Sequence, residues 1–376
     1  MTPAEFREAF RSWLAGVDLD ASPVQSGSVA VLLAHQRRLQ RLLYDADLMR
    51  WGWPESVGGL GGSPVLRAVL GEELTSRGLV HTTTWTMLEV LGPAVIAYGR
   101  PGVVTEIFPR LLRGDETWCQ GFSEPEAGSD LGSLRTTARR AGDGDSWVIN
   151  GEKLWTSFAH GASRCVVLAR TGPAGSGSRG ISAFLVDMDT PGISARPLQT
   201  MADVDEFCAT SFTDVVVPAD RLLGDVDGGW RVAGHILGCE RGAIFWQRGA
   251  WLGHHLAALL PLATDARSQA LVGDAFQLLW TFRARSMATQ RQIAAGAVPG
   301  AETSVDKIMI AAAEQAVFDT ARELLAGAIE TGDTPEAAAW RREWFYSRAA
   351  TIYGGTSEIQ KDIVSLRLLG LPRGGR

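Results

Sequence analysis

The sequence predicts an α+β fold that is mainly α, with one β-rich unit inserted between two helical blocks. Apolar residues recur at helical spacing from the N-terminus to about Arg113. Short apolar runs bounded by turn residues replace this spacing between Trp118 and about Leu223. Helical spacing returns after Gly228-Gly229 and continues, with breaks near 294–303 and 331–335. The predicted units are residues 1–117, 118–223 and 224–376.

The first block opens with a strong helix signal. Thr2-Pro3-Ala4-Glu5 has the form of a capping box with proline at the first helical position. The Gly-rich run 58–62 lacks the preceding strand that a dinucleotide fingerprint requires, so we interpret it as a loop.

The middle block contains regularly spaced strand candidates. Residues 147–155 form two short runs around Asn150-Gly151, a dipeptide typical of hairpin turns. Further strands are expected at 165–169, 181–186 and 207–217.

Composition excludes several classes of protein. The chain has 376 residues and a net charge of −6, which argues against nucleic acid as a partner. No apolar run approaches the roughly 20 residues of a membrane span. The four cysteines are scattered and no export signal is recognised, so we expect reduced thiols, a cytoplasmic location and no metal site.

Two stretches of the middle block could contact a ligand. Residues 118–131 are rich in Gly, Ser and Pro, and predict a strand that opens into a loop with free hydroxyl and N–H groups. A plain surface turn is the alternative. Trp155-Thr156-Ser157 places an aromatic ring beside two hydroxyls, which suits a flat ligand with polar edges, although a core tryptophan would look the same.

Glu240 is the candidate catalytic carboxylate. It lies three and four residues after Leu237 and Ile236 and four before Ile244, on the apolar stripe of a helix. Burial there would raise its pKa toward that of a useful base. Pairing with Arg241, or a place at the edge of the stripe, is the alternative.

Gly354-Gly355 precedes a hydroxyl-rich run that looks like a helix start. The pair could form a turn, or it could leave the backbone N–H uncovered so that a ligand can approach closely.

Three of these segments together resemble the acyl-CoA dehydrogenase family. They are Phe-Ser-Glu-Pro-Glu-Ala-Gly-Ser-Asp at 122–130, Trp-Thr-Ser at 155–157 and Ile-Tyr-Gly-Gly-Thr-Ser-Glu-Ile-Gln at 352–360. The helix–strand–helix order is similar too. Trp-Cys-Gln at 118–120 and Leu-Gly-Leu-Pro-Arg at 369–373 resemble actinobacterial members, including those of sterol side-chain breakdown.

The resemblance implies an N-terminal helical domain, a middle β-barrel and a C-terminal four-helix bundle, with FAD between barrel and bundle. By motif matching, the cofactor-binding residues would be Phe122, Ser123, Gly128, Ser129, Trp155, Ser157, Thr356 and Glu358. The N-terminal amides of the last helix would favour phosphate. Glu126 departs from the family, which usually has glycine there, so phosphate could approach this loop differently.

The resemblance also implies the reaction, an α,β-desaturation of an acyl thioester. Many members carry the catalytic glutamate where this chain has Gly354, which cannot act as a base. Others carry it just before an arginine on the first long helix of the C-terminal domain, which matches Glu240. The expected assignment is Glu240 as base, the Gly354 N–H as oxyanion donor, and Ser129, Arg241, Tyr353 and Gly354 as substrate contacts.

The implied partners are an acyl-CoA substrate, an electron-transfer flavoprotein or similar acceptor, and a homo- or hetero-oligomer. Homotetrameric relatives carry an Arg-x-x-Phe-Gly element that residues 264–272 lack, so an unlike acyl-CoA dehydrogenase subunit is a possible partner. Three alternatives stay open: a non-catalytic subunit, an acyl-CoA oxidase and a flavin monooxygenase. An acyl-carrier protein could replace CoA, and the small residues Gly238, Gly242 and Ala243 could leave room for a bulky acyl group.

Overall fold

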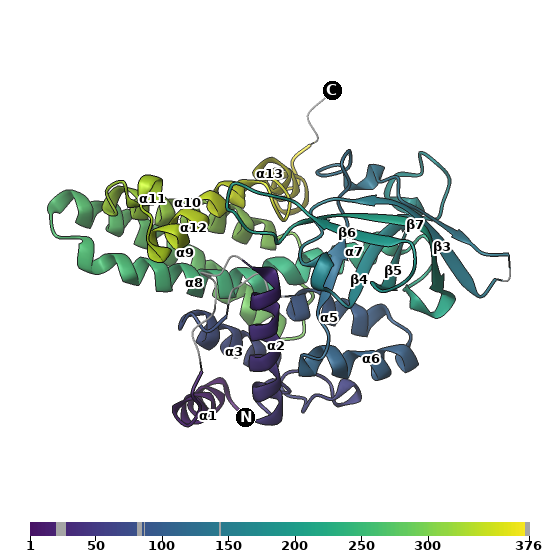
Figure 1. Ribbon diagram of the computed structural model, residues 1–376, viewed down its shortest axis with the longest axis horizontal. Helices are drawn as coiled ribbons and strands as arrows, with labels where there is room; N and C mark the ends of the chain where they lie inside the picture. Colours follow the sequence, from purple (N-terminus) through teal and green to yellow (C-terminus); the bar gives the residue numbers. More distant parts are fainter. Residues whose placement is uncertain (20–27, 81–84, 86, 143, 373–376) are drawn as a thin grey trace.

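The computed structural model describes residues 1–19, 28–80, 85, 87–142 and 144–372. Figure 1 shows the C-terminal helices extending to one side, the β-sheet on the other, and the N-terminal helices below them. The last helix, α13 (Ser357–Ile363), lies where bundle and sheet meet. The junction of the three units is therefore the place to look for a site.

The N-terminal unit is helical, as the apolar spacing predicts. Its elements are α1 (Pro3–Ala15), α2 (Val29–Asp45), a 3-10 turn (Glu55–Val57), α3 (Val65–Thr75), α5 (Met87–Tyr98) and α6 (Pro101–Arg113). The predicted capping box is confirmed, because Thr2 Oγ1 accepts from the Glu5 N–H at 3.3 Å and Glu5 Oε2 accepts from the Thr2 N–H at 2.7 Å.

The middle unit is an eight-stranded sheet. Its strands are β1 (Trp118–Gly121), β2 (Thr137–Arg140), β3 (Ser146–Lys153), β4 (Arg164–Arg170), β5 (Ile181–Asp187), β6 (Ile193–Pro197), β7 (Cys208–Pro218) and β8 (Leu222–Leu223). The strand order is β6-β7-β3-β2-β4-β5-β8, with β1 paired in parallel to β4. One face buries its own core, and the other packs with the N-terminal helices.

The predicted hairpin at Asn150-Gly151 is wrong. β3 runs through both residues, and its pairing with β7 shifts register between Ile149 and Gly151, which marks a bulge. A Cβ on Gly151 would lie 2.5 Å from Thr136 Oγ1, so glycine serves a close strand contact there and not a turn. The Asn150 side chain binds Asp214 of β7.

The C-terminal unit is a set of long helices. They are α7 (Gly229–Cys239), a π-helical turn (Glu240–Ile244), α8 (Phe245–Leu259), α9 (Ala266–Ala294), α10 (Thr303–Leu324), α11 (Ala328–Thr331), α12 (Pro335–Arg348) and α13, followed by a second π-helical turn (Val364–Leu368). The two predicted breaks are confirmed, one between α9 and α10 and one between α11 and α12. The breaks at 260–265 and 325–327 lie outside the predictions. No helix of the described residues is long and apolar enough to cross a membrane.

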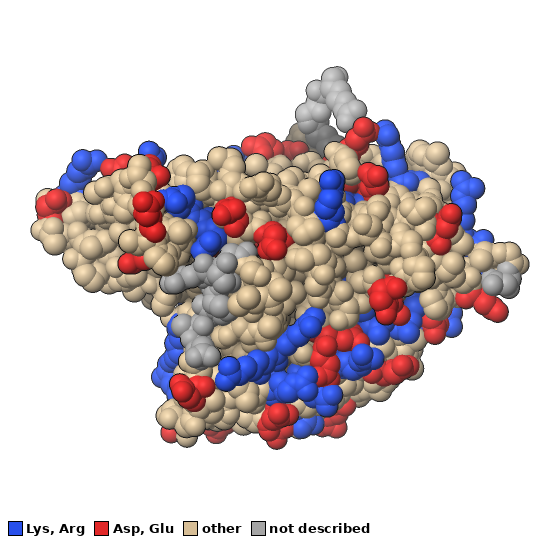
Figure 2. Space-filling view, viewed as in Figure 1, with Lys and Arg blue, Asp and Glu red and all other residues tan. Residues whose placement is uncertain are grey.

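Charged side chains of both signs intermix on the face in Figure 2. Exposed charges of opposite sign pair on the surface, as Arg267 and Glu323 do at 3.0 Å. Such pairs are exposed and stabilise the fold only slightly.

Candidate active site

Glu240 stands at the first residue of the π-helical turn between α7 and α8. A π turn inserts an extra residue into a helix and is frequent at functional sites. Helix α9 braces the turn, because Gln290 Nε2 donates to the Gly242 carbonyl at 2.8 Å. The backbone that carries Glu240 is therefore held in an uncommon but supported conformation.

The carboxylate of Glu240 lies against Gly354. A Cβ built on Gly354 would be 2.9 Å from Glu240 Oε1, so the carboxylate occupies space that a side chain at position 354 would need. Gly354 and Gly355 have φ values of +63° and +91°, in the region that favours glycine. Among the described residues, the Gly354 N–H has no hydrogen-bond acceptor. A carboxylate and a free amide donor are thus brought together from distant parts of the chain.

Substituting Gly354 should be costly. We expect Gly354→Ala to lower the free energy of unfolding by about 1–2 kcal/mol, because a Cβ is unfavourable at this φ and crowds Glu240. Denaturant titration of both proteins measures the change. Gly234→Ala is the matched control, since Gly234 lies in α7 with open space around it and alanine should be neutral or stabilising there. Equal stability of Gly354→Ala and wild type would contradict the expected strain.

Three groups surround the Glu240 carboxylate. Burial raises the pKa of Glu240 above its ordinary value, while Arg241, Lys307 and the side-chain amide of Gln120 act to lower it. Part of the Glu240 side chain nevertheless stays accessible, which a base must be to reach a substrate. The buried Gln120 Oε1 has no hydrogen-bond partner within the described part of the chain.

Tyr353 is fixed by a buried charge network. Its hydroxyl donates to Glu314 Oε2 at 3.1 Å. Glu314 is fully buried and also accepts from Arg248, which in turn pairs with Glu343 at 3.2 Å. Burial and the Glu314 carboxylate raise the pKa of Tyr353 well above its ordinary value, so its hydroxyl is a donor and not an anion at neutral pH.

The segment after Gly355 is organised as a helix start. Thr356 Oγ1 accepts from the Ile359 N–H at 3.3 Å and caps α13. Glu358, in the first turn of this helix, is exposed. The buried Gln360 side chain donates to the Gly354 and Gly355 carbonyls at 3.0 and 3.3 Å. These bonds orient the peptides on either side of the glycine pair.

On the sheet side, Trp155 has a φ of +61° and is 55% exposed. Its ring meets Phe207 edge to face with centroids 5.7 Å apart, and Phe207 stacks on Tyr346 of the bundle. Next to Trp155, the buried Thr156 Oγ1 has no partner in the described residues, and Ser157 is partly exposed. This edge of the sheet therefore offers the exposed face of Trp155 and one hydroxyl oxygen, that of Thr156, without a hydrogen-bond partner in the described residues.

The predicted residues of the β1–β2 loop divide into two groups. Phe122 is buried and Ser123 offers its carbonyl to the Leu154 N–H. Gly128 and Ser129 are exposed, and Ser129 lines a hollow of about 790 Å³. The hollow is also lined by Asp130, Leu131, Gly132, Ser133, Leu134, Arg135, Thr137, Arg170, Ala174, Gly175, Gly177, Ser178 and Trp230.

The departure at Glu126 has a simple local outcome. Its carboxylate pairs with Arg135 at 2.9 Å, and both side chains are largely exposed. The side chain is thus occupied at the surface and does not cover the backbone of the loop.

Gly238 and Gly242 do not open a space beside Glu240, and the side chain of Ala243 lies outside the described residues. A Cβ on Gly238 would lie 2.8 Å from the Pro299 carbonyl oxygen, and one on Gly242 would lie 2.8 Å from Ile293 Cδ1. Both glycines admit close packing of the helices. They are not evidence for a bulky acyl group.

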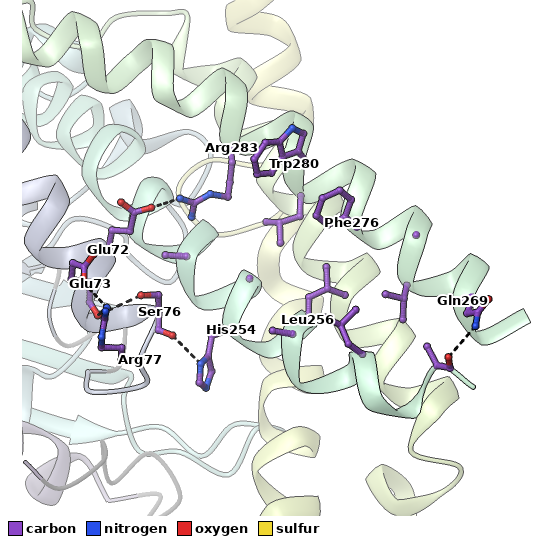
Figure 3. A pocket seen from close by; sticks show the side chains of 18 of the residues that line it. Glu72, Glu73, Ser76, Arg77, His254, Leu256, Gln269, Phe276, Trp280 and Arg283 are labelled. Atoms are coloured by element: carbon purple, nitrogen blue, oxygen red, sulfur yellow. Dashed lines mark hydrogen bonds and ion pairs between the residues drawn. The ribbon is translucent and has the colours of Figure 1, made fainter. Parts of the chain in front are cut away.

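A second hollow, a groove of about 1000 Å³, lies between α8 and α9 (Figure 3). At one end the buried Glu73 carboxylate accepts ion pairs from Arg7, Arg11 and Arg77. The rest is mainly apolar, formed by residues such as Leu256, Val272, Phe276, Leu279 and Trp280. None of the predicted site residues lines this groove.

Sequence reasoning missed Gln120, Lys307, Glu314 and Gln360. Gln120 and Gln360 stand in the motifs at 118–120 and 352–360 but had no predicted role, and their contacts, like those of Glu314, depend on tertiary packing. Lys307 left a different signal in the sequence. Lys307 is one of three lysines in the chain and directly precedes the apolar run 308–313 of α10. A lone lysine beside such a run indicates either a helix edge or a buried cation.

Comparison with known proteins now gives the class. The N-terminal, middle and C-terminal domains of the acyl-CoA dehydrogenase family match residues 30–115, 119–215 and 227–369. The chain therefore belongs to the acyl-CoA dehydrogenase family and is an oxidoreductase, which indicates acyl-CoA dehydrogenation in general. The predicted family and fold class are confirmed.

Two acyl-CoA dehydrogenases illustrate how similar this chain is to known members of the family in sequence. The chain is 36% identical over 380 residues to acyl-CoA dehydrogenase IpdE1 of Mycobacterium tuberculosis, covering 98% of each chain. It is 30% identical to the human mitochondrial short-chain specific acyl-CoA dehydrogenase over 84% of this chain and 78% of the relative.

Solved structures agree. The steroid ACAD Tcur3481-Tcur3483 matches with a TM-score of 0.85 and 25% identity, covering 99% of this chain and 98% of that one. A chain of the ChsE4-ChsE5 complex from Mycobacterium tuberculosis matches with a TM-score of 0.81 and 26% identity, covering 99% and 98%.

Proposed function

We propose that this chain catalyses the flavin-dependent α,β-dehydrogenation of an acyl-CoA thioester, with Glu240 as the base. The observation that carries the proposal is the contact between the Glu240 carboxylate and Gly354, beside an amide N–H that has no acceptor among the described residues. A base and an oxyanion donor are the two groups that removal of a weakly acidic α-proton requires.

The surroundings of Trp155 fit FAD. An exposed aromatic face suits a flat ring, and the neighbouring Thr156 Oγ1 has no partner in the described residues, so a polar atom of a ligand could satisfy it. The side chains of Trp155, Ser157, Thr356 and Glu358 would hold the cofactor, with the loop at Ser123, Gly128 and Ser129. Phe122 is buried and would act through its backbone or as support. FAD, when bound, accepts the β-hydrogen of the substrate as hydride.

Glu240 removes the α-proton. Its carboxylate gains the proton as the α-C–H bond breaks, and that electron pair becomes part of the new double bond as the β-hydrogen leaves. The raised pKa of Glu240 makes it a stronger base than an exposed carboxylate. The Gly354 N–H donates to the thioester oxygen as negative charge develops on it.

The hollow beside Ser129 suits the polar carrier of the acyl group. Its lining combines serine hydroxyls with the largely exposed guanidinium of Arg135, a group that binds phosphate. Arg241, whose Nε has no hydrogen-bond partner in the described residues, is one of the two cations that act on Glu240. An acyl-carrier protein remains an alternative carrier, because its phosphopantetheine shares this chemistry.

An unlike subunit is the proposed oligomeric partner. Helix α9 exposes Phe276 and Trp280, stacked with ring centroids 5.8 Å apart, and such apolar patches mark protein contacts. The segment that lacks the Arg-x-x-Phe-Gly element forms the capped start of α9, with Asp265 and Ser268 in a capping box. The similar ChsE4-ChsE5 structure is a complex of two chains, which supports testing such a partner first.

The test is anaerobic reduction of the purified protein. We expect a yellow protein whose flavin absorbance bleaches on addition of an acyl-CoA, and the steroid ACAD among the similar structures makes a steroid acyl-CoA the first choice beside linear and branched ones. An electron-transfer flavoprotein or an artificial acceptor should reoxidise it, whereas rapid oxygen consumption would indicate an oxidase or a monooxygenase. Absence of flavin from the chain alone and from the chain co-expressed with its partner would contradict the proposal.

A further inference from the structure

Lys307 is a buried cation that the proposed reaction leaves unexplained. The chain has three lysines, of which Lys153 pairs with Glu124 at 2.8 Å and Lys361 is exposed. Lys307, on α10, is 1% exposed, and no carboxylate of the described residues lies within ion-pair distance of it. Burying an ammonium without a paired carboxylate costs free energy, so we expect Lys307 to have a role that offsets this cost.

Two residues of α10 contact the Tyr353 side chain, Lys307 at the ring and Glu314 at the hydroxyl. Lys307 Nζ lies 4.5 Å from the centroid of the Tyr353 ring, and Glu314, seven residues later on the same helix face, accepts from the Tyr353 hydroxyl. Lys307 Nζ also donates to the Ala350 carbonyl. The segment 350–353 is therefore anchored at three points immediately before Gly354.

The Lys307 side chain also reaches the base. A Cβ built on Gly354 would lie 3.5 Å from Lys307 Cε and 2.9 Å from Glu240 Oε1, so both side chains border the same space. Arg241 and Lys307 are the cations that face Glu240, and Gln120 approaches it from β1. Arg367 faces Arg241, Glu314 acts on Lys307, and Tyr353 is within the electrostatic reach of Glu240.

The ionisations of the two groups are linked. Burial lowers the pKa of Lys307 to about 8, with Glu314 and Glu240 acting in the opposite direction. Burial raises the pKa of Glu240, and Lys307 acts to lower it. The ammonium therefore favours the carboxylate form of Glu240 at neutral pH.

We propose that Lys307 is a positioning residue for proton abstraction, which anchors Gly354 beside Glu240 and keeps Glu240 as a carboxylate. The proposal rests on the proposed function, in which Glu240 is the base. It assigns to the cation an effect on the protonation of that base, beyond support of the backbone.

The first test needs no catalysis. Protein labelled with 13C at lysine Cε should give three NMR signals, assigned with Lys361→Arg and Lys153→Arg. We expect the Lys307 signal to titrate near pH 8 in wild type and at lower pH in Glu240→Gln, because coupling between two sites is reciprocal. Lys361 is the internal control and should titrate identically in both proteins. An unchanged Lys307 titration in Glu240→Gln would overturn the proposal.

The second test is the pH dependence of flavin reduction in single-turnover experiments. The rate rises with pH as Glu240 loses its proton, and removal of the ammonium in Lys307→Met should move this rise to higher pH by about one unit or more. The rate at pH values below the rise should then fall about tenfold or more and recover at high pH. Lys307→Gln, which keeps a donor for Ala350, should show the same shift with less loss at high pH.

A purely structural role would lower the rate equally at all pH values, and that result would overturn the proposal. Lys361→Met is the control and should keep the wild-type profile, since Lys361 is exposed. If Lys307→Met does not fold, Lys307→Gln and the NMR titration still decide. Full activity of Glu240→Gln would instead contradict the proposed function, so the two failures are distinguishable.

Discussion

Glu240→Gln should bind flavin normally and lose about 10²–10⁴-fold in the rate of flavin reduction by acyl-CoA, the usual contribution of a positioned general base. The amide keeps the size of the side chain beside Gly354 and removes only the ability to accept the α-proton. Stopped-flow absorbance under anaerobic conditions measures the rate, and the flavin spectrum before mixing reports cofactor binding.

Glu89→Gln is the matched control for this experiment. Burial also raises the pKa of Glu89, which pairs with Arg67 at 3.3 Å on the N-terminal side of the molecule. It should keep the wild-type reduction rate even if it changes stability. Bleaching of Glu240→Gln at the wild-type rate would show that another group takes the proton.

Arg248→Met should have the largest effect on stability, a loss of about 3–5 kcal/mol in the free energy of unfolding. Arg248 is 3% exposed and its guanidinium binds Glu314 at 2.9 and 3.1 Å and Glu343 at 3.2 Å. Methionine fills much of the same space but leaves two buried carboxylates without their cation. Chemical denaturation measures the loss through the transition midpoint.

Arg267→Met tests whether burial of the ion pair causes the large loss of stability expected for Arg248→Met. Arg267 pairs with Glu323 at 3.0 Å on the surface of the same bundle, with both side chains at least half exposed, so its loss should cost less than about 1 kcal/mol. Adding Glu314→Gln to Arg248→Met should recover part of the stability, because one buried charge is then removed. A loss below 1 kcal/mol for Arg248→Met would contradict the role of the network.

The successes and failures of sequence reasoning follow the range of the interactions involved. The capping box at Thr2 and the helix breaks depend on neighbours along the chain, and the structure has them where the sequence predicts them. The turn prediction at Asn150-Gly151 failed because Gly151 serves a close contact with Thr136, the residue before β2, which a local turn signal cannot reveal.

The candidate site shows the same division. The apolar spacing singled out Glu240, and the family resemblance singled out Gly354, but the sequence does not reveal that the Glu240 carboxylate occupies the space that a side chain at position 354 would need. The residues around this pair, Gln120, Lys307 and Gln360, come from β1, α10 and α13.

The sequence by itself determined the order of helices and strands, the family and the residue types available for proton transfer. These depend on local spacing, capping and motif, which act within a few residues of chain. Only the tertiary structure decided that the Glu240 carboxylate fills the space beside Gly354, and that Lys307 is enclosed between Tyr353 and this pair. Burial and charge proximity, which shift a pKa, depend on how distant segments pack, and the order of residues alone does not specify that packing.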